Sequence, residues 1–203
     1  AIITSPPYWG LRQYTLGVGQ IFEIGMEANV KAYISSLAKV FGQLRHVLKP
    51  GGSLWINIDD VYIDKNLQGI PWKLVAELKK QGWLCRADII LDRTNAMPEN
   101  VSDRVTRSHE YLFHLTKQNY YYYDAEAIRE PAKFSELRVK NPRKPKKTDD
   151  SYRRHHNVQG NRSGLNGRNR RSVWSITDNN SNRTTGHPAT FAKSIVEPCI
   201  LAT

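Results

Sequence analysis

The order of the expected elements most constrains what this chain can fold into. Between residues 28 and 49, apolar side chains recur every three or four positions, which predicts a helix that ends at Pro50-Gly51-Gly52. The short apolar run 53–58 then predicts a buried strand, residues 70–81 a second helix, and residues 83–91 another strand. Strands and helices that alternate in this way build a parallel, doubly wound sheet with right-handed crossovers.

Other segments extend this pattern toward both ends of the chain. Residues 1–4 predict the last half of a buried strand, residues 172–176 a short strand, and residues 191–201 a helix. Residues 110–116 and 120–123 are strand-like runs at hairpin spacing, which predicts an antiparallel pair at one edge of the sheet. The predicted fold class is therefore α/β, mostly parallel with an antiparallel edge hairpin. The first strand lacks a lead-in and the last helix a capping glycine, so we expect both ends to be cut from a longer protein.

Length and composition exclude several classes of protein. The 203 residues are 39% hydrophobic and 24% charged, which suits one globular domain with a single core. We see neither an apolar run of roughly 18 residues nor a charged leader before a cleavage site, so a soluble intracellular protein is expected. The two cysteines, Cys85 and Cys199, are too few for a disulfide framework or a zinc knuckle, and no metal site is expected.

The positive charge is concentrated in one segment. Fourteen of the 30 Lys and Arg residues but only four of the 19 acids lie between Arg129 and Arg171, so ten of the eleven net charges fall there. Such a segment fits either a polyanionic partner, most simply nucleic acid, or a solvated linker. We therefore divide the chain into a core at 1–130, a flexible basic insertion at 131–171 and a return to the core at 172–203. The candidate DNA-contacting residues of the insertion are Arg143, Lys144, Lys146, Lys147, Arg153 and Arg154.

The segment from Ser5 to Trp9 directly follows the first predicted strand. Pro6 and Pro7 fix φ near −65°, remove two N–H donors and hold Ser5 extended, which makes a rigid rim at the carboxyl end of the strand. There the Ser5 side chain and the Pro6 carbonyl could accept hydrogen bonds from an amino group, while Tyr8 offers an aromatic face. The alternative is a proline-rich turn that ends a strand, with Tyr8 and Trp9 covering the edge of the core.

Several pieces of sequence, taken together, resemble the amino-group DNA methyltransferases that modify N4 of cytosine or N6 of adenine. The resemblance covers nearly the whole chain outside the basic segment and follows the motif order of the beta class, in which the catalytic segment precedes the glycine-rich cofactor motif. The pieces are Ser5-Pro6-Pro7-Tyr8-Trp9, Leu48-Lys49-Pro50-Gly51-Gly52, Leu54 to Asp60, Asn95 to Glu99, Arg107 to Tyr111, Arg171 to Trp174, His187 to Phe191 and Glu197-Pro198.

The resemblance implies a reaction and a site. It implies a Rossmann-like, seven-stranded sheet and S-adenosylmethionine-dependent methylation of a base that has been flipped out of double-stranded DNA. Ser5, Pro6, Pro7 and Tyr8 match the catalytic motif: Ser5 and the Pro6 carbonyl would hold the amino group, and Tyr8 would stack on the base. Serine at the first motif position resembles the N4-cytosine members more than the N6-adenine ones, so cytosine is favoured and adenine stays open.

The resemblance also implies a role for each part of the chain: residues 1–130 would be the catalytic core, the basic insertion 131–171 would lie near target recognition, and residues 172–203 would carry an element of the cofactor pocket. His187, Pro188 and Phe191 match the family element that lines it, although a helix start with Phe191 in the core explains these residues equally well. The family's Asp-Pro-Phe-x-Gly-Ser-Gly segment is expected shortly after Leu201, beyond the given sequence. These 203 residues alone are therefore expected to bind S-adenosylmethionine poorly.

Further polar residues match the family around the second and third long strands. Asp60 matches a recurrent acid, and Asp59 stands where glycine is usual. Four others resemble the border of the base pocket or, alternatively, belong to a structural network: Asn95, Arg107, Ser108 and His109.

Two functional hypotheses follow. According to the first, the chain is the larger part of a site-specific DNA methyltransferase. This enzyme would work in the cytoplasm of a prokaryote or phage host, associated with the nucleoid, and a cognate restriction endonuclease could accompany it. The second is a non-catalytic, nucleic-acid-binding remnant of the same fold, suggested by the missing glycine segment and the basic loop.

Overall fold

The computed structural model describes residues 1–11, 23–131, 167–176 and 191–203. The chain divides into two compact units, one formed by residues 1–123 and 171–203 and the other by residues 124–170. In the part of the chain that is described, no helix is both long and apolar enough to cross a bilayer.

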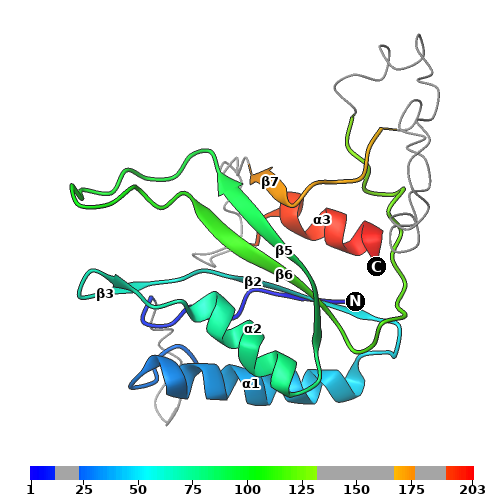
Figure 1. Cartoon of the computed structure of the whole chain (residues 1–203), viewed down its shortest axis with the longest axis horizontal. Coiled ribbons are helices and arrows are strands. Elements are labelled where there is room, and N and C mark those ends of the chain that lie inside the picture. The colour runs from blue at the N-terminus through cyan, green and yellow to red at the C-terminus, as the bar shows by residue number, and fades with distance from the viewer. Residues whose placement is uncertain (12–22, 132–166, 177–190) are drawn as a thin grey trace, which may run out of the picture. The chain divides into compact units, whose positions relative to one another are not determined.

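A five-stranded sheet forms the centre of the first unit (Figure 1). Its order is β1 (Ile2–Thr4), β2 (Ser53–Ile58), β6 (His109–Thr116), β5 (Leu84–Arg93) and β7 (Val173–Ile176). β1 pairs parallel with β2, and β5 pairs parallel with β7, whereas β6 runs antiparallel to both of its neighbours. Four of the five strands thus share one direction, and the predicted α/β class is confirmed.

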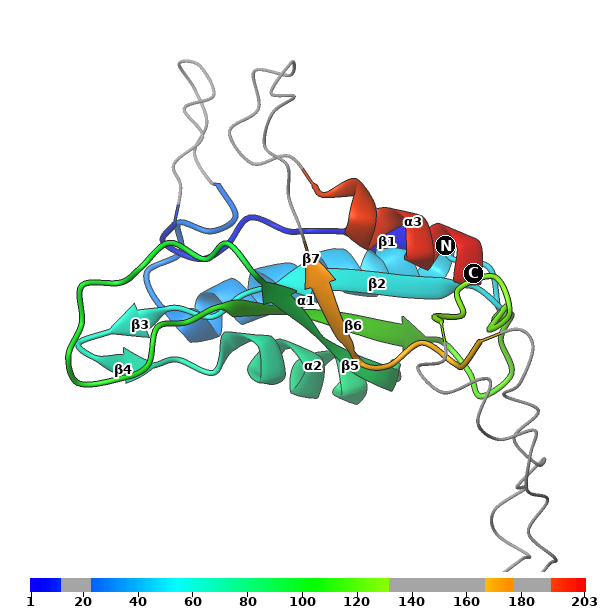
Figure 2. The same ribbon diagram turned by 90° about the horizontal axis from the view of Figure 1, so that it is seen from above.

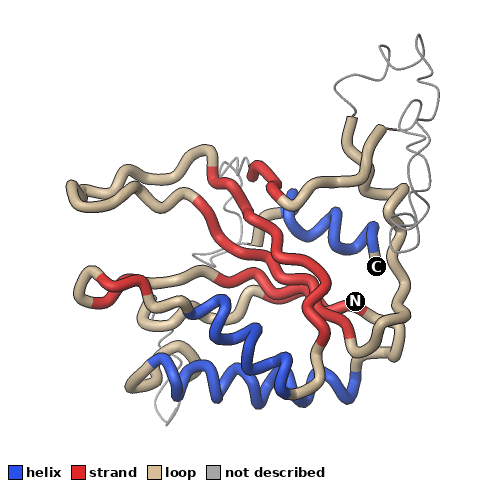
Figure 3. The backbone as a smooth tube through the Cα atoms, in the orientation of Figure 1, coloured by secondary structure: helices blue, strands red, loops and turns tan. Residues whose placement is uncertain are grey.

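Within the described ranges, three helices accompany the sheet, at the places where periodicity predicted them (Figure 3). α1 (Val30–Val47) begins where the Asn29 side chain accepts a hydrogen bond from the amide of Ala32 at 2.9 Å. α2 (Ile70–Lys80) has a proline in its first turn, where no amide donor is needed. α3 (Lys193–Ala202) closes the described chain. Figure 2 shows α1 and α2 on one side of the sheet and α3 on the other.

The two faces of the sheet have different chemistry. Leu54, Ile56 and Ile58 of β2 point to the face that α1 and α2 cover, and with them they form the main apolar core. The alternate residues point to the opposite face, where Trp55 lies opposite His114 and donates to the Thr203 hydroxyl at 3.3 Å. Polar side chains are buried on that second face, and these include Ser53, Asn57, Glu110, His114 and Thr116.

One local prediction was wrong, and one local element was not predicted. Residues 120–123 form no strand; the hairpin partner of β6 is instead β5, across the long connection 94–108, so the antiparallel strand lies within the sheet. A short hairpin that we did not predict, β3 (Tyr62–Ile63) and β4 (Asn66–Leu67), follows β2. Its two-residue turn has φ of 47° at Asp64 and 63° at Lys65, the left-handed values that such turns require.

The described part of the second unit consists of residues 124–131 and 167–170. Glu130 and Arg168 form an antiparallel bridge, and their side chains form an ion pair at 2.8 Å. Gly167 has a φ of 81°, and a Cβ there would lie 2.5 Å from the Glu130 carbonyl oxygen, so this bridge requires glycine.

Candidate active site

The Ser5 to Tyr8 segment lies where the sequence predicted it, directly after the carboxyl end of β1. Ser5 is exposed, Pro6 is buried, and Pro7 and Tyr8 are partly buried. The Pro7 carbonyl accepts a hydrogen bond from the hydroxyl of the buried Tyr33 at 2.6 Å. α1 thereby holds the segment in place through Tyr33, and Ser5 stays accessible at its outer end.

Trp9 has a structural role in the same rim. Its indole N–H donates to the Glu27 carbonyl at 2.8 Å, and the Gly10 amide donates to the Gly25 carbonyl at 2.8 Å. The segment after the prolines is thus tied to the chain that leads into α1. Trp9 packs against the main apolar core, which agrees with the interpretation that it covers the edge of the core.

Tyr8 points to a buried acid on β6. Its hydroxyl donates to Glu110 Oε2 at 2.9 Å, and the same oxygen accepts from Asn57 Nδ2 at 2.9 Å. Arg93 forms an ion pair with Glu110 Oε1. Segments that are up to 102 positions apart in sequence thus converge on one carboxyl group, which is only 4% exposed.

The environment of Tyr8 keeps its phenol protonated. Burial raises the pKa of Tyr8 far above its usual value, and the negative charge of Glu110 raises it further. The nearby Ser5 side chain acts in the opposite direction on the same pKa but does not outweigh them. Tyr8 therefore acts as a hydrogen-bond donor toward Glu110 at any physiological pH.

A second ion pair lies beside this cluster. Arg107 donates twice to Asp59 Oδ1, at 2.9 Å from Nε and 2.6 Å from the terminal nitrogen. Burial acts to lower the pKa of Arg107, but its hydrogen bonds to Asp59 and the charge of that acid outweigh the effect, so the pKa is raised. The guanidinium also lies 5.9 Å from the centre of the Tyr111 ring. These contacts support the interpretation that Arg107 belongs to a structural network.

Asp60 also has a structural role. Its carboxylate accepts the amides of Val61 at 2.9 Å, Gly69 at 2.7 Å and Ile70 at 3.1 Å. Asp60 therefore closes the β3–β4 excursion and caps the start of α2.

The other residues expected at the border of the base pocket are arranged differently. Asn95 is exposed on the connection between β5 and β6. The Ser108 carbonyl accepts the amide of Arg93 at 2.8 Å, and the His109 ring meets the Tyr111 ring edge to face at 5.4 Å. Ser108 and His109 thus make contacts at the end of the β5–β6 pair where the connection 94–108 joins the two strands.

Most of the predicted cofactor-binding and DNA-binding residues lie outside the described part of the chain. This holds for His187 and Pro188 and for all six basic residues of the insertion, namely Arg143, Lys144, Lys146, Lys147, Arg153 and Arg154. Phe191 is described; it is half-buried and comes two residues before α3.

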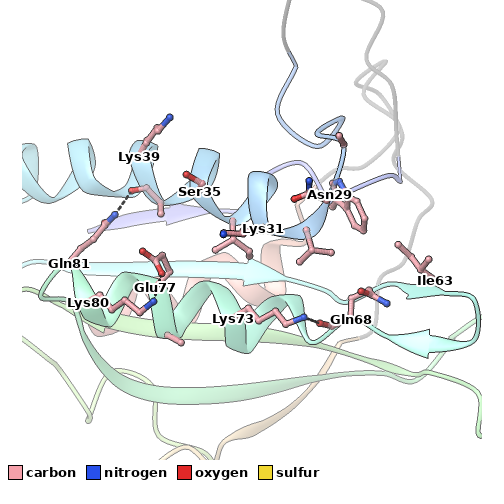
Figure 4. A pocket seen from close by; sticks show the side chains of 16 residues that line it. Asn29, Lys31, Ser35, Lys39, Ile63, Gln68, Lys73, Glu77, Lys80 and Gln81 are labelled. Atoms are coloured by element: carbon pink, nitrogen blue, oxygen red, sulfur yellow. Dashed lines mark hydrogen bonds and ion pairs between the residues drawn. The ribbon is translucent and has the colours of Figure 1, made fainter.

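A groove of about 1120 Å³ lies between α1 and α2, away from the predicted catalytic residues (Figure 4). Four lysines line it, Lys31 and Lys39 from α1 and Lys73 and Lys80 from α2, together with apolar side chains such as Ile34. Trp9 reaches its lining, but none of the residues from Ser5 to Tyr8 does.

Sequence reasoning missed Glu110, Asn57 and Arg93 as parts of the site. The available signal was a polar residue next to apolar ones in a strand: Asn57 interrupts the run Leu54 to Ile58, and Glu110 precedes the run Tyr111 to Phe113 in β6. Such residues need a partner when they are buried, but sequence alone does not identify the partner.

Comparison with known proteins assigns the chain to a family. Residues 1–203 match the N6_N4_Mtase family, which is described as DNA methylase. The chain is 36% identical to the Type II methyltransferase M.Cfr9I of Citrobacter freundii, with 99% of this chain and 65% of that protein covered, and 37% identical to the Type II methyltransferase M.SmaI of Serratia marcescens, with 99% and 67% covered. The chain belongs to this DNA methylase family, as its motifs predicted, and it spans about two thirds of the length of these relatives.

The fold agrees with this membership. The chain aligns over its full length with the solved structure of PvuII DNA methyltransferase (cytosine-N4-specific), with a TM-score of 0.63, 13% sequence identity and 62% of that chain covered. At this identity the likeness concerns the fold, and it confirms the predicted methyltransferase-type sheet.

Proposed function

We propose that this chain is the catalytic part of a DNA methyltransferase that moves a methyl group from S-adenosylmethionine to an exocyclic amino group, with N4 of cytosine as the favoured acceptor. The observation that carries the proposal is the placement of Ser5, Pro6 and Tyr8 at the carboxyl end of β1, next to a buried hydrogen-bonded acid. Open α/β sheets bind their ligands at this edge. Membership of the DNA methylase family and the cytosine-N4-specific name of the aligned structure add support.

The residues of the rim suit an amino group as their ligand. Ser5 Oγ and the Pro6 carbonyl oxygen are acceptors, and an exocyclic amine carries two N–H donors. Two accepted hydrogen bonds would orient the nitrogen lone pair, which must point at the incoming carbon. Gain of a methyl group leaves the nitrogen with one proton too many, and this proton leaves to water beside the exposed Ser5. Positioning of this kind accounts for most of the rate enhancement that such a site needs.

Tyr8 would hold the base from its face. An amino group in a duplex is engaged in pairing, so the base has to leave the stack before it can reach the rim. The half-buried ring of Tyr8 replaces part of the lost stacking energy, since aromatic stacking contributes about 1–3 kcal/mol per base.

The cofactor would be held by the element that leads into α3. When bound, S-adenosylmethionine supplies an electrophilic methyl group. Of the three residues proposed to contact it, His187, Pro188 and Phe191, the structure describes Phe191, whose half-buried ring offers the apolar surface that adenine and methionyl groups pack on. The fit of this one residue agrees with the proposed pocket.

The basic insertion would contact the DNA backbone. Its six candidate residues carry positive charge and would contribute salt-dependent affinity that does not depend on base sequence. The enzyme would act on double-stranded DNA in the cytoplasm of a prokaryotic or phage-infected cell. A cognate restriction endonuclease could accompany it, in line with the Type II names of its relatives.

A labelled-methyl assay tests the proposal. The intact protein is incubated with S-adenosylmethionine and unmethylated DNA of broad sequence content, and the DNA is digested to nucleosides. N4-methylcytosine is the expected product, and N6-methyladenine would move the proposal to adenine. If neither product is found, and calorimetry shows that the folded protein binds DNA but not the cofactor, a non-catalytic binding role would be favoured.

A further inference from the structure

We propose that Arg93 is a base-binding residue: its guanidinium group, held in place by Glu110, donates hydrogen bonds to the ring nitrogen N3 and the carbonyl oxygen O2 of the flipped cytosine. This inference rests on the proposed function and deepens it, because it names a group that would recognise the cytosine ring apart from its amino group. It starts from the location of Arg93, the last residue of β5.

The backbone of Arg93 is fixed at the same edge of the sheet as the rim. β5 runs in the same direction as β1, so both strands end at that edge. The Arg93 amide donates to the Ser108 carbonyl at 2.8 Å, and Arg93 is paired with Ile176 of β7. Open α/β sheets bind their ligands at this edge, so the Arg93 side chain starts from a position where a ligand is expected.

One carboxyl group joins Arg93 to the rim. The Arg93 guanidinium pairs with Glu110 Oε1, and the Tyr8 hydroxyl donates to Oε2 of the same acid at 2.9 Å. Arg93 and Tyr8 are thus separated by no more than one carboxyl group and its two contacts. A base that stacks on the Tyr8 ring would therefore lie within reach of the Arg93 side chain.

The Arg93 side chain has donors left for a ligand. It is 53% exposed, whereas the side chain of Glu110 is only 5% exposed. A guanidinium group carries five N–H donors in one plane, and among the described residues Glu110 is the single ion-pair partner of Arg93. The acid thus fixes the guanidinium group from its buried side and leaves further N–H donors on the exposed side.

The charge of this pair favours a neutral acceptor over a phosphate group. Glu110 neutralises Arg93, so the pair offers oriented donors without a net positive charge. A phosphate group would bring a second negative charge close to the Glu110 carboxylate, which is unfavourable. Cytosine instead presents two neutral acceptors side by side, N3 and O2, and a planar guanidinium can bind two such atoms at once. Adenine has one ring acceptor beside its amino group, followed by a C–H, so the same group would favour cytosine.

Binding of a close analogue of cytosine tests this inference without methyl transfer. The intact protein first selects its preferred duplex from a random-sequence library, and each cytosine of that site is placed in turn opposite an abasic position. The cytosine is then replaced by 3-deazacytosine, which keeps the amino group and O2 but has a C–H in place of N3. Fluorescence anisotropy gives the two dissociation constants, and wild type should bind cytosine about tenfold more tightly at one position.

Two variants of Arg93 and one control separate its donors from its charge. Arg93→Met removes the donors and should reduce the tenfold factor to less than about twofold. Arg93→Lys keeps an ion pair with Glu110, and with it the fold, but lacks the planar pair of donors, so the factor should fall to about threefold. Arg86→Met removes an exposed arginine at the other end of β5, whose side chain donates to the Tyr121 hydroxyl at 3.3 Å, and should keep the wild-type factor.

The salt dependence of binding distinguishes the base from a phosphate group as the partner of Arg93. A phosphate contact would lower the magnitude of the slope of log K against log salt by about 0.9 in Arg93→Met and leave the cytosine factor unchanged. The inference would be overturned by that result, by a factor unchanged in both Arg93 variants, by an equal fall in Arg86→Met, or by a wild type that distinguishes the two bases at no position. The labelled-methyl assay is read separately: methylation together with any of these results contradicts only the role of Arg93, whereas absent methylation contradicts the proposed function.

Discussion

Glu110 and His114 lie on the same face of β6, and both are buried, but their surroundings differ. Three donors surround the acid: the hydroxyl of Tyr8, the amide of Asn57 and the guanidinium of Arg93. His114 instead stacks on Trp55, with ring centres 4.1 Å apart, and its Nε2 lies 2.9 Å from the Ser53 hydroxyl.

The difference shows that hydrogen-bond partners, and not burial alone, determine what a buried polar group can do. At the carboxyl edge the partners hold a charged group in a fixed orientation next to an exposed rim. At the other end of β6, burial lowers the pKa of His114 to about 4, and the positive charge of Arg86 acts in the same direction, so the imidazole stays neutral and packs as an aromatic ring. Only the first arrangement is suited to hold a ligand.

The largest expected effect is on stability, from removal of the acid. Glu110→Leu leaves the Tyr8 hydroxyl without its acceptor, the Asn57 amide with only the Tyr111 carbonyl at 3.2 Å, and Arg93 without its ion-pair partner. We therefore expect the free energy of unfolding to fall by about 3 kcal/mol. His114→Phe keeps the ring stacking and should cost less than half as much. Urea unfolding of both variants measures this, and equal losses would erase the distinction between the two ends of β6.

The next effect is on activity, from removal of the Tyr8 ring. Under the proposed function, Tyr8→Ala should lower the rate of methyl transfer about 100-fold, because the base would lose the surface proposed to orient it. Tyr122→Ala, which removes a tyrosine side chain that is 64% exposed at the other end of β6, should stay within about twofold of wild type. Single-turnover assays measure both rates, and similar losses in the two variants would argue against a special role for Tyr8.

His114 gives a smaller, pH-dependent effect. The pKa of His114 is about 4 in the folded protein against an ordinary value of 6.5, so the unfolded chain takes up the proton first and stability falls as the pH drops from 6.5 toward 4. At pH 5 the loss amounts to about 2 kcal/mol relative to pH 7. Unfolding of wild type and His114→Phe across this range should show a flatter profile for the variant; parallel profiles would mean that His114 does not titrate as its surroundings indicate.

The smallest effect concerns the exposed ion pair between Lys65 and Asp103, which joins the β3–β4 hairpin to the β5–β6 connection at 3.0 Å. Lys65→Ala should change the free energy of unfolding by less than about 0.5 kcal/mol, since exposed pairs are screened by water and salt. The same urea titration measures it. A larger loss would show that the two projecting loops depend on this contact.

The sequence predicted the elements better than their pairing. Periodicity located β2 at residues 53–58, α1 within 28–49 and α2 within 70–81, because each pattern is local and has a glycine or proline close to at least one end. The partner of β6 was wrong, since hairpin reasoning favours the nearest strand-like run, whereas β5 returns across the fifteen-residue connection 94–108. The apolar composition of β2 predicts that both of its faces are buried, but it does not show which strands pair with it.

The rim of the site was predictable, and its support was not. Ser5, Pro6 and Tyr8 lie within four positions, so their common location follows from one strand and two prolines. Glu110 is 102 positions from Tyr8 and 53 from Asn57, and only the register of the sheet brings the three together.

A photocross-link tests the central claim most directly. Once the modified base has been mapped, 5-iodocytosine at that position in the duplex is irradiated with the intact protein bound, and the attached peptide is sequenced by mass spectrometry. A base that stacks on the rim should cross-link to Tyr8, and Tyr8→Ala should abolish the product. Attachment to a residue away from Ser5 to Tyr8, at a yield unaffected by that substitution, would contradict the account.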